Sequence, residues 1–224
     1  MKKWIFFIVL FTIPFASCKD DDDPEPEIPR TPYDDIIGTY RNIDLASEDL
    51  AFFIEYDAQK QKLLFFMDCY EEPFIPAVKF ISEGSYLLTG EYEGDDGVTG
   101  WYSISAAHGK LTLKSDKTKK ELVAIFRTTE RDLGYAIEGD YLGVSTAEDG
   151  ELRPATAVID RTAKNQISVR INGVVFAASV EADFEEEIYV FKGIGIEGRN
   201  DGKIYIEYVS NGKKYSFSTV YKFV

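Results

Sequence analysis

The sequence predicts an all-β protein, folded as an antiparallel meander barrel or sandwich, with two tandem β domains of similar pattern. Apolar and polar residues alternate with a period of two through almost the whole chain after residue 33, which is typical of strands that bury one face. Turn-forming residues interrupt this alternation about every eight to twelve positions. No window of about eleven residues carries the apolar stripe of an amphipathic helix, so we expect very little helix.

The clearest predicted element is a hairpin in the segment KIYIEYVSNGKKYSFSTVYKF. Ile204, Ile206 and Tyr208 share one face of its first strand. Asn211-Gly212 supplies the two positive φ angles of a type I′ turn, and the alternation then resumes. Read in the same way, the whole chain predicts strands at residues 37–43, 50–56, 62–68, 76–82, 85–93, 99–106, 109–115, 120–128, 136–144, 154–160, 166–171, 173–181, 187–197, 203–209 and 214–222.

The first seventeen residues, MKKWIFFIVLFTIPFAS, have the composition of a secretory signal peptide. Lys2 and Lys3 give a basic start, and an apolar run follows from Trp4 to Phe15. A membrane-spanning helix needs about 20 apolar residues to cross about 30 Å of hydrocarbon, and this run is shorter. We therefore expect residues 1–17 to be removed after export.

Small residues precede Cys18 in the sequence Phe15-Ala16-Ser17-Cys18. This stretch resembles the lipobox of bacterial lipoproteins, in which the cysteine thiol receives a diacylglycerol before the signal peptide is cut away. The resemblance implies that Cys18 is the lipidated first residue of the mature protein, attached to a membrane by its acyl chains. The alternative is an ordinary signal peptide followed by a chance cysteine.

An acidic and proline-rich segment, residues 18–33, follows the lipidation site. The acidic cluster at its start resembles the surface-export signal of Bacteroidetes lipoproteins, and the resemblance implies an outer-membrane lipoprotein on the cell surface. Like charges and prolines also keep a tether extended, so a solvated linker is the alternative. The residues of the expected export signal are Lys19, Asp20, Asp21, Asp22 and Asp23.

Charge and cysteine content exclude several classes of function. The formal net charge is −14 for the whole chain and falls to −16 when Lys2 and Lys3 leave with the signal peptide, so nucleic acid is not an expected partner. With Cys18 acylated, Cys69 has no partner for an intrachain disulfide. We interpret Cys69 as a small buried hydrophobic residue rather than a nucleophile.

Three segments repeat in the same order in the two halves of the chain. Residues 36–43 match 137–144, residues 52–66 match 156–170, and residues 102–126 follow 193–221 in pattern. We interpret this order as a tandem repeat with its boundary at TERDLGYA, residues 129–136. The expected domains are 34–130 and 135–224.

Each half opens with a Gly-x-Tyr sequence, Gly38-Thr39-Tyr40 and Gly139-Asp140-Tyr141, and then runs as short strands. This resembles the calycin-like or lipocalin-like β-barrel domains of Bacteroidetes lipoproteins. The resemblance implies the binding of small hydrophobic or peptide ligands rather than catalysis. Because each half is short for an eight-stranded barrel that holds a ligand, a barrel filled by side chains or a two-sheet sandwich stays open.

No catalytic machinery, cofactor site or metal site is predicted. One histidine, His108, at an expected turn, and one free cysteine cannot build a zinc site of the usual nitrogen and sulfur type. A Ser-His-Asp triad would have to use His108, and no Gly-x-Ser-x-Gly motif accompanies it. The segment Gly193 to Gly198 has the letters of a dinucleotide fingerprint but leads into a strand instead of a helix, so we interpret Gly193 and Gly195 as one face of a strand. The acidic groups, which we expect to be solvated hairpin tips, are Glu93, Asp95 and Asp96, and Glu185, Glu186 and Glu187.

Trp101 and Tyr102 are the candidate ligand-binding residues. Adjacent strand residues point to opposite faces, so we expect one of these rings to face outward, where it could stack on a sugar or a partner; the alternative is a core role. The expected function is a lipid-anchored envelope protein that binds a glycan, a peptide or a small hydrophobic molecule. Alternatives are a structural or accessory subunit of an outer-membrane protein complex and, more remotely, a glycoside hydrolase that uses paired acids.

Overall fold

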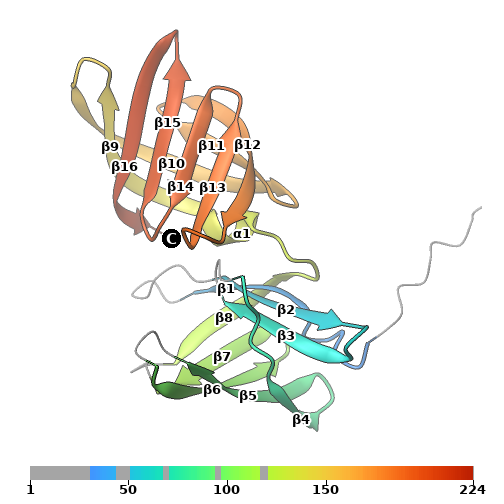
Figure 1. Ribbon diagram of the computed structural model, residues 1–224. Coiled ribbons are helices and arrows are strands. Elements are labelled where there is room, and N and C mark those ends of the chain that lie inside the picture. Colours follow the sequence, from blue (N-terminus) through green and yellow to red (C-terminus); the bar gives the residue numbers. More distant parts are fainter. Residues whose placement is uncertain (1–30, 44–50, 68–70, 94–96, 117–120, 224) are drawn as a thin grey trace, which may run out of the picture. The chain divides into compact units, whose positions relative to one another are not determined.

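The computed structural model describes residues 31–43, 51–67, 71–93, 97–116 and 121–223. It is all-β, as predicted, and its strands form two antiparallel eight-stranded arrays that follow one another in the sequence (Figure 1). The first array contains β1 (Gly38–Asn42), β2 (Ala51–Asp57), β3 (Lys62–Met67), β4 (Ala77–Ser82), β5 (Ser85–Glu93), β6 (Thr99–Ala107), β7 (Lys110–Ser115) and β8 (Leu122–Thr128).

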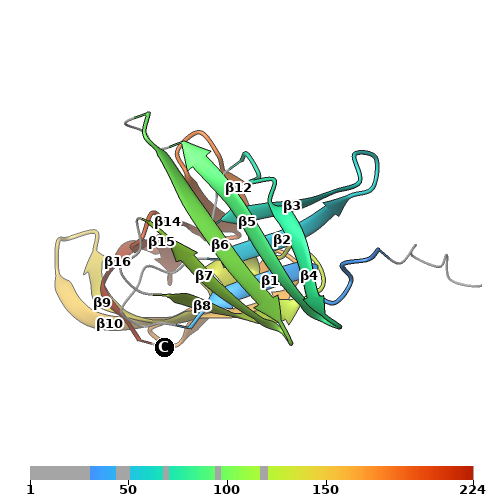
Figure 2. The same cartoon turned by 90° about the horizontal axis from the view of Figure 1, so that it is seen from below.

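The first array is a nearly closed barrel with the strand order β3-β2-β1-β8-β7-β6-β5-β4 (Figure 2). Its two end strands are not paired along their length. Instead, Phe65 of β3 exchanges two backbone hydrogen bonds with Phe74, of 2.9 and 2.8 Å, just before β4 begins. Beyond this bridge, β4 pairs only with β5 among the described strands.

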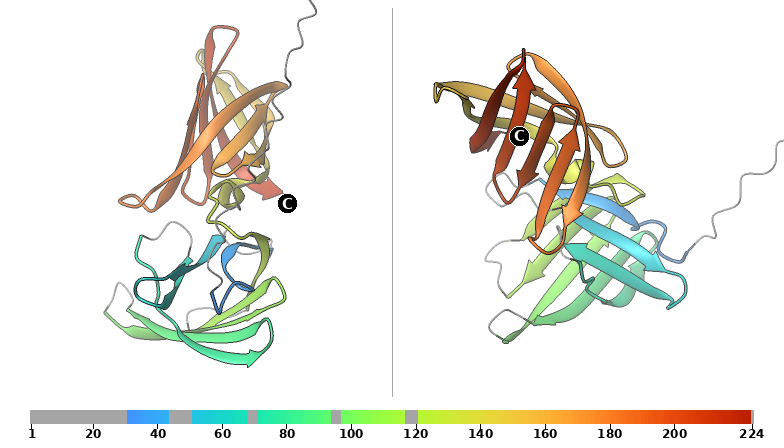
Figure 3. Two further views of the ribbon diagram at one scale, coloured as in Figure 1. Left: turned by 90° about the vertical axis from the view of Figure 1, so that its right-hand side faces the viewer. Right: turned by 45° about the horizontal axis from the view of Figure 1, so that its top comes forward.

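The second array is a closed barrel with the order β10-β11-β12-β13-β14-β15-β16-β9 (Figure 3). A four-residue helix, α1 (Gly134–Ile137), precedes it. No helix in the described part of the chain is long and apolar enough to span a bilayer. The strands of this barrel are β9 (Gly139–Ala147), β10 (Leu152–Ala163), β11 (Gln166–Ile171), β12 (Val174–Asp183), β13 (Ile188–Gly193), β14 (Ile196–Asn200), β15 (Ile204–Ser210) and β16 (Lys213–Phe223).

The predicted strands agree with the observed ones to within three residues at each end, except in two places. The single strand expected at 187–197 is wrong: it is interrupted by a turn at Ile194-Gly195, which separates β13 from β14. Gly195 takes a φ of +73°, so Gly193 and Gly195 do not form one face of a strand. The strand expected at 136–144 begins later, at Gly139, because α1 occupies its first residues.

Both halves repeat the same strand pairing, which confirms the internal repeat at the level of topology. The first strand of each array pairs with the second and with the eighth. Each Gly-x-Tyr sequence makes the same structure: the buried Tyr40 hydroxyl donates to the Ile36 carbonyl at 2.9 Å, and the buried Tyr141 hydroxyl donates to the Ile137 carbonyl at 2.6 Å. The three-letter match therefore marks an equivalent corner at the start of each barrel.

The cores of both barrels combine aromatic and aliphatic side chains. In the first, Phe52 stacks on Phe65 at 5.7 Å between ring centroids. In the second, aliphatic side chains such as Ile159 and Val169 lie with rings such as Phe191 and Phe217.

The segment between the barrels is anchored through a buried aspartate. Asp132 is 1% exposed and pairs with Arg161 at 2.8 Å. Its other carboxylate oxygen accepts backbone N–H groups from Gly134 and Asn165, and the Asn165 side chain accepts the N–H of Leu133. Four hydrogen bonds therefore hold the start of α1 against the β10–β11 turn.

Candidate binding site at the open end of the second barrel

The two ends of the second barrel are closed to different degrees. At the end that contains the β10–β11 turn, Leu133, Ala136 and Ile137 of the α1 region join the hydrophobic core and cover it. The opposite end, here called the open end, has no such cover in the described chain. It is formed by the turns at 148–151, Asn172-Gly173, Ile194-Gly195 and Asn211-Gly212.

Local sequence explains why these turns leave the open end accessible. Asn172 and Asn211 take φ values of +51°, and each is followed by a glycine with positive φ, as a type I′ turn requires. These two-residue turns reverse the chain with minimal length. They leave the interior of the barrel uncovered, and the type I′ turn predicted at Asn211-Gly212 is confirmed.

A cavity of about 910 Å³ lies at the open end. This volume is within the range of small-molecule sites, about 300 to 1,000 Å³. Apolar groups supply part of its wall. The residues that line the cavity are Ser145, Ala147, Glu148, Asp149, Glu151, Arg153, Pro154, Asn172, Val174, Tyr208, Ser210, Lys213 and Tyr215.

A hydrogen-bonded group of three side chains forms the polar part of the cavity. The hydroxyls of Ser145 and Tyr208 are 2.9 Å apart, and the Asn172 amide donates to the Tyr208 oxygen at 3.0 Å. Ser145 and Tyr208 are 4% and 3% exposed, so these are buried polar atoms inside a barrel of apolar residues. Buried hydroxyls are kept where they have hydrogen-bonding partners.

Aromatic rings fix the orientation of Tyr208. Its ring stacks on Tyr215 at 5.3 Å with an interplanar angle of 18°, and Phe176 meets it edge-on at 5.8 Å. Both contacts have the geometry that aromatic pairs prefer. The Tyr208 hydroxyl is consequently held in place from the ring side as well as by Asn172.

The rim of the cavity carries mixed charge with an acidic excess. Glu148, Asp149 and Glu151 lie on the β9–β10 turn, and Lys213 lies on the β15–β16 side. Arg153 is already engaged by Glu151, through N–O contacts of 3.0 and 2.8 Å. This hydrogen-bonded carboxylate raises the pKa of the Arg153 guanidinium. Lys213 is thus the rim cation without an ion pair among the described residues.

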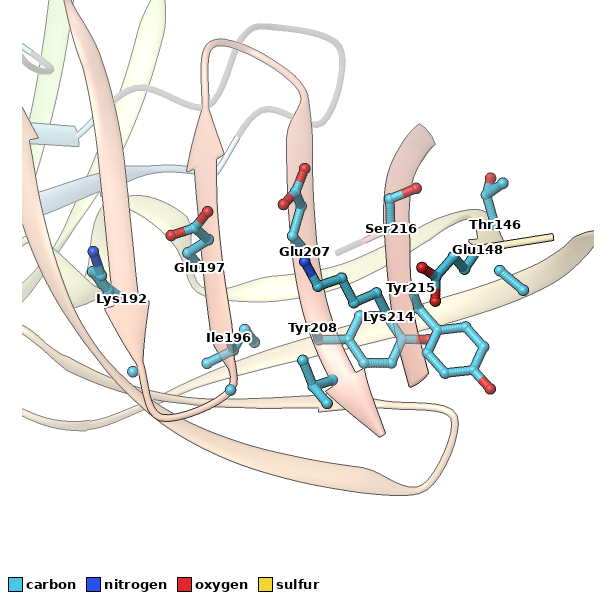
Figure 4. A pocket seen from close by; sticks show the side chains of 14 residues that line it. Thr146, Glu148, Lys192, Ile196, Glu197, Glu207, Tyr208, Lys214, Tyr215 and Ser216 are labelled. Carbon is cyan, nitrogen blue, oxygen red and sulfur yellow. The ribbon is translucent and has the colours of Figure 1, made fainter. Parts of the chain in front are cut away.

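A second hollow, of about 450 Å³, adjoins the open end over β14, β15, β16 and β9 (Figure 4). Ala147, Glu148, Tyr208 and Tyr215 line both spaces. The outer part of this hollow is polar. Opposed residues form a row across the sheet, in the order Ser179, Lys192, Glu197, Glu207, Ser216 and Thr146.

Glu197 and Glu207 face each other directly in this row. Both are exposed, and neither has an ion pair with another described residue. Like charges directly opposite on neighbouring strands destabilise a sheet. The contact between the two carboxylates is therefore unfavourable, although Lys192 faces Glu197 from the strand on its other side.

The candidate residues chosen from the sequence lie apart from the open end. Trp101 is on β6 of the first barrel and is 51% exposed. It is thus the ring of the Trp101–Tyr102 pair that faces outward, as strand alternation predicts for one of them. Tyr102 is 6% exposed, and its ring packs edge-on against Phe74 at 5.4 Å between centroids. It therefore has the core role that was the alternative to ligand binding. Ligands in solution can reach Trp101 but not the ring of Tyr102.

The remaining sequence-derived candidates in the described residues do not line the cavity at the open end. His108 occupies a tight turn with a φ of +50°, and Glu185 and Glu186 are exposed on the β12–β13 turn. Within the described residues, no three His, Cys, Asp or Glu side chains are placed to hold a metal ion. The candidates that lie outside the described residues are Cys18, Lys19, Asp20, Asp21, Asp22, Asp23, Cys69, Asp95 and Asp96.

Sequence reasoning missed the residues of the open end. The available signals were Asn172-Gly173, which has the letters of a second type I′ turn, and Ser145, a small polar residue at an inward position of β9. Neither signal reveals that Ser145 and Tyr208, far apart in the sequence, meet inside a closed barrel. That meeting depends on strand order.

Comparison with known proteins gives no family. No protein-family profile matches the chain, and no curated protein matches it. A candidate outer membrane protein from Bacteroides fragilis is similar to it at 13% identity, over 82% of this chain and 97% of that one, with a TM-score of 0.31. A DUF3598-family protein of unknown function from Nostoc punctiforme is similar at 11% identity, over 87% and 100% of the two chains, with a TM-score of 0.25. Because both TM-scores are below 0.5, neither likeness assigns a function to this chain.

Proposed function

We propose that this protein is a lipid-anchored binding protein of the cell envelope that takes up a small, largely apolar molecule at the open end of its second barrel. The observation that supports this is the cavity of about 910 Å³, in which Ala147, Val174 and two tyrosine rings lie beside a buried polar group and below a charged rim. Small-molecule sites are clefts of this size in which a few placed polar atoms fix the orientation of the ligand.

The test is uptake of the fluorescent dye N-phenylnaphthylamine by the purified mature chain carrying Cys18→Ser. We expect dye fluorescence to rise with protein concentration. Val174→Trp places a large ring in the cavity and should abolish the rise. Val175→Trp is the matched control, because Val175 is the next residue and is 62% exposed on the outer face of β12.

Equal dye uptake by the two tryptophan variants would place binding elsewhere on the protein. Absence of uptake by the parent chain would remove the proposal for small apolar ligands. A thermal transition measured for each variant shows that it is folded. The glycan and peptide alternatives are then examined with the same variants and a glycan or peptide array.

The proposed location is the outer membrane, with the barrels outside the cell. It is supported by the Phe15-Ala16-Ser17-Cys18 sequence and by the acidic cluster that follows. Replacing Asp20 to Asp23 with alanine should keep the lipid but turn the protein toward the periplasm. Protease treatment of intact cells measures this. Equal cleavage of variant and parent would show that the acidic cluster is only a linker.

A second candidate function, as an accessory subunit of an outer-membrane protein complex, is supported by the edge strand β4. β4 pairs only with β5 in the described part, and it exposes Phe80 (62%) and Ile81 (53%). An exposed apolar edge strand is suited to pairing with another chain. Affinity isolation from solubilised outer membranes tests this, with Ile81→Lys expected to lose a partner that the parent retains.

A further inference from the structure

The hydroxyl groups of Ser145 and Tyr208 carry two hydrogens, but the hydrogen bond between them involves only one. Each hydroxyl carries one hydrogen, and the 2.9 Å contact between the two oxygens consumes one of them. The Asn172 amide is a donor to the Tyr208 oxygen and accepts nothing there. Whichever hydroxyl donates to the other, one O–H remains.

This remaining O–H has no acceptor among the described residues. The recorded bonds of the two hydroxyls are only those to each other and from Asn172. Both residues line the cavity at the open end, and both side chains are more than nine-tenths buried. A buried donor without an acceptor is unfavourable, by an amount comparable to a lost hydrogen bond. Water can accept it until a ligand takes the place of that water.

The charges around the cavity select against an anionic acceptor. Among its lining residues, Glu148, Asp149 and Glu151 outnumber Arg153 and Lys213, and Arg153 is held by Glu151. No cationic side chain is hydrogen-bonded to the Ser145–Tyr208 pair. A carboxylate placed there would be desolvated without a counter-ion, which is strongly unfavourable.

We propose that the ligand enters the open end with an uncharged hydrogen-bond acceptor leading, such as a ketone, ester or amide carbonyl, which receives the remaining hydrogen of the Ser145–Tyr208 pair. This inference rests on the proposed function. The apolar remainder of the ligand lies toward Val174, Ala147 and Tyr215. The second barrel thus distinguishes carbonyl compounds from hydrocarbons and from carboxylates of the same shape.

Three probes of nearly equal shape test this inference: naphthyl methyl ketone, isopropenylnaphthalene and naphthoate, which present a carbonyl, a methylene and a carboxylate at the same position. Displacement of N-phenylnaphthylamine gives their affinities for the full mature chain. We expect the ketone to bind about fivefold tighter than the alkene, the effect of one neutral hydrogen bond, and naphthoate to bind most weakly.

The hydrogen count makes a distinctive prediction for variants. Ser145→Ala leaves the Tyr208 hydrogen free, and Tyr208→Phe leaves the Ser145 hydrogen free, so each single variant should keep a preference for the ketone. Removing both hydroxyls also frees the Asn172 N–H, so the combined variant carries Asn172→Gly as well, which the φ of +51° allows. This triple variant has none of the three donors and should bind ketone and alkene equally. Ser216→Ala, on the outer face of β16, is the control and should keep the full preference.

Equal affinities for ketone and alkene in the parent chain would overturn the inference, as would a preference for naphthoate or a ketone preference that persists in the triple variant. In each of these cases dye uptake by the parent still supports the proposed function. If neither the dye nor any probe binds, both the proposed function and this inference fail.

Discussion

The hydroxyl of Tyr141 donates a hydrogen bond to the carbonyl of Ile137, four residues earlier, and ties α1 to the first strand of the second barrel. Tyr40 makes the equivalent bond to Ile36 in the first barrel. Both tyrosines are at most 2% exposed, so loss of either hydroxyl removes a donor from a buried carbonyl.

We expect Tyr141→Phe and Tyr40→Phe each to lower the free energy of unfolding by about 1 kcal/mol. Chemical denaturation of the full mature chain measures this. Tyr205→Phe, at a tyrosine that is 37% exposed, is the control and should change stability little. Similar stability in all three variants would mean that the two corners do not hold the barrels.

Alkaline pH should destabilise the first barrel through Tyr102. Burial raises the pKa of Tyr102 from 10.0 to about 12. The unfolded chain therefore releases this proton first, so the stabilising contribution is complete below about pH 10 and is lost as the pH rises toward about 12. Denaturation midpoints from pH 9 to pH 12 should fall less steeply for Tyr102→Phe than for the parent, and parallel curves would contradict the assignment.

Relief of the Glu197–Glu207 repulsion should stabilise the second barrel. Glu207→Lys places a cation opposite Glu197, and we expect a gain of about 0.5 kcal/mol that shrinks at high salt. Glu181→Lys makes the same change in net charge opposite Val190 and is the matched control. An equal gain in both variants would trace the effect to total charge instead of the pair.

The proposed domain boundary predicts that the second barrel folds alone. A fragment from Glu130 to Val224 should show dispersed amide resonances and a cooperative thermal transition, because the barrel closes on itself. A fragment from Leu133 lacks Asp132 and its bonds to Arg161, Gly134 and Asn165, and should be less stable by about 2 kcal/mol or more. An insoluble longer fragment would argue for a single folding unit.

Lipidation at Cys18 is the prediction that decides where the protein resides. Cys18→Ala should remove incorporation of a palmitate analogue and leave the protein in the soluble fraction of the envelope. Cys69→Ala is the control and should label like the parent. A Cys18→Ala protein that still incorporates the lipid would contradict the lipoprotein interpretation.

Period-two alternation was sufficient to predict the all-β class, the small helix content and most strand positions, because each strand buries one face. It failed at Ile194-Gly195, where an apolar residue sits in a two-residue turn and is 99% exposed. The pattern continues through that turn without a polar break, so only backbone geometry reveals the reversal. The Gly-x-Tyr match was the most informative short signal, since it marks the same corner in both barrels.

The candidate site was not predictable in the same way. Ser145 and Tyr208 become neighbours only because β9 and β15 both flank β16 in a closed barrel. Alternation placed Tyr208 on an inward face, but it carries no information about which residue lies across the interior. Trp101 was singled out for its size and surroundings, and those properties are independent of whether a cavity lies nearby.

The pairing of first and eighth strands in each array also bears on the order in which the chain folds. Neighbouring hairpins can form as soon as their residues are present, whereas β1–β8 and β9–β16 contacts join residues from opposite ends of a repeat. Their loop-closure entropy is large, and such non-local pairing makes folding slow. The second barrel should therefore remain an open sheet until β16 has been made, and the pairing of β9 with β16 is then the committing step.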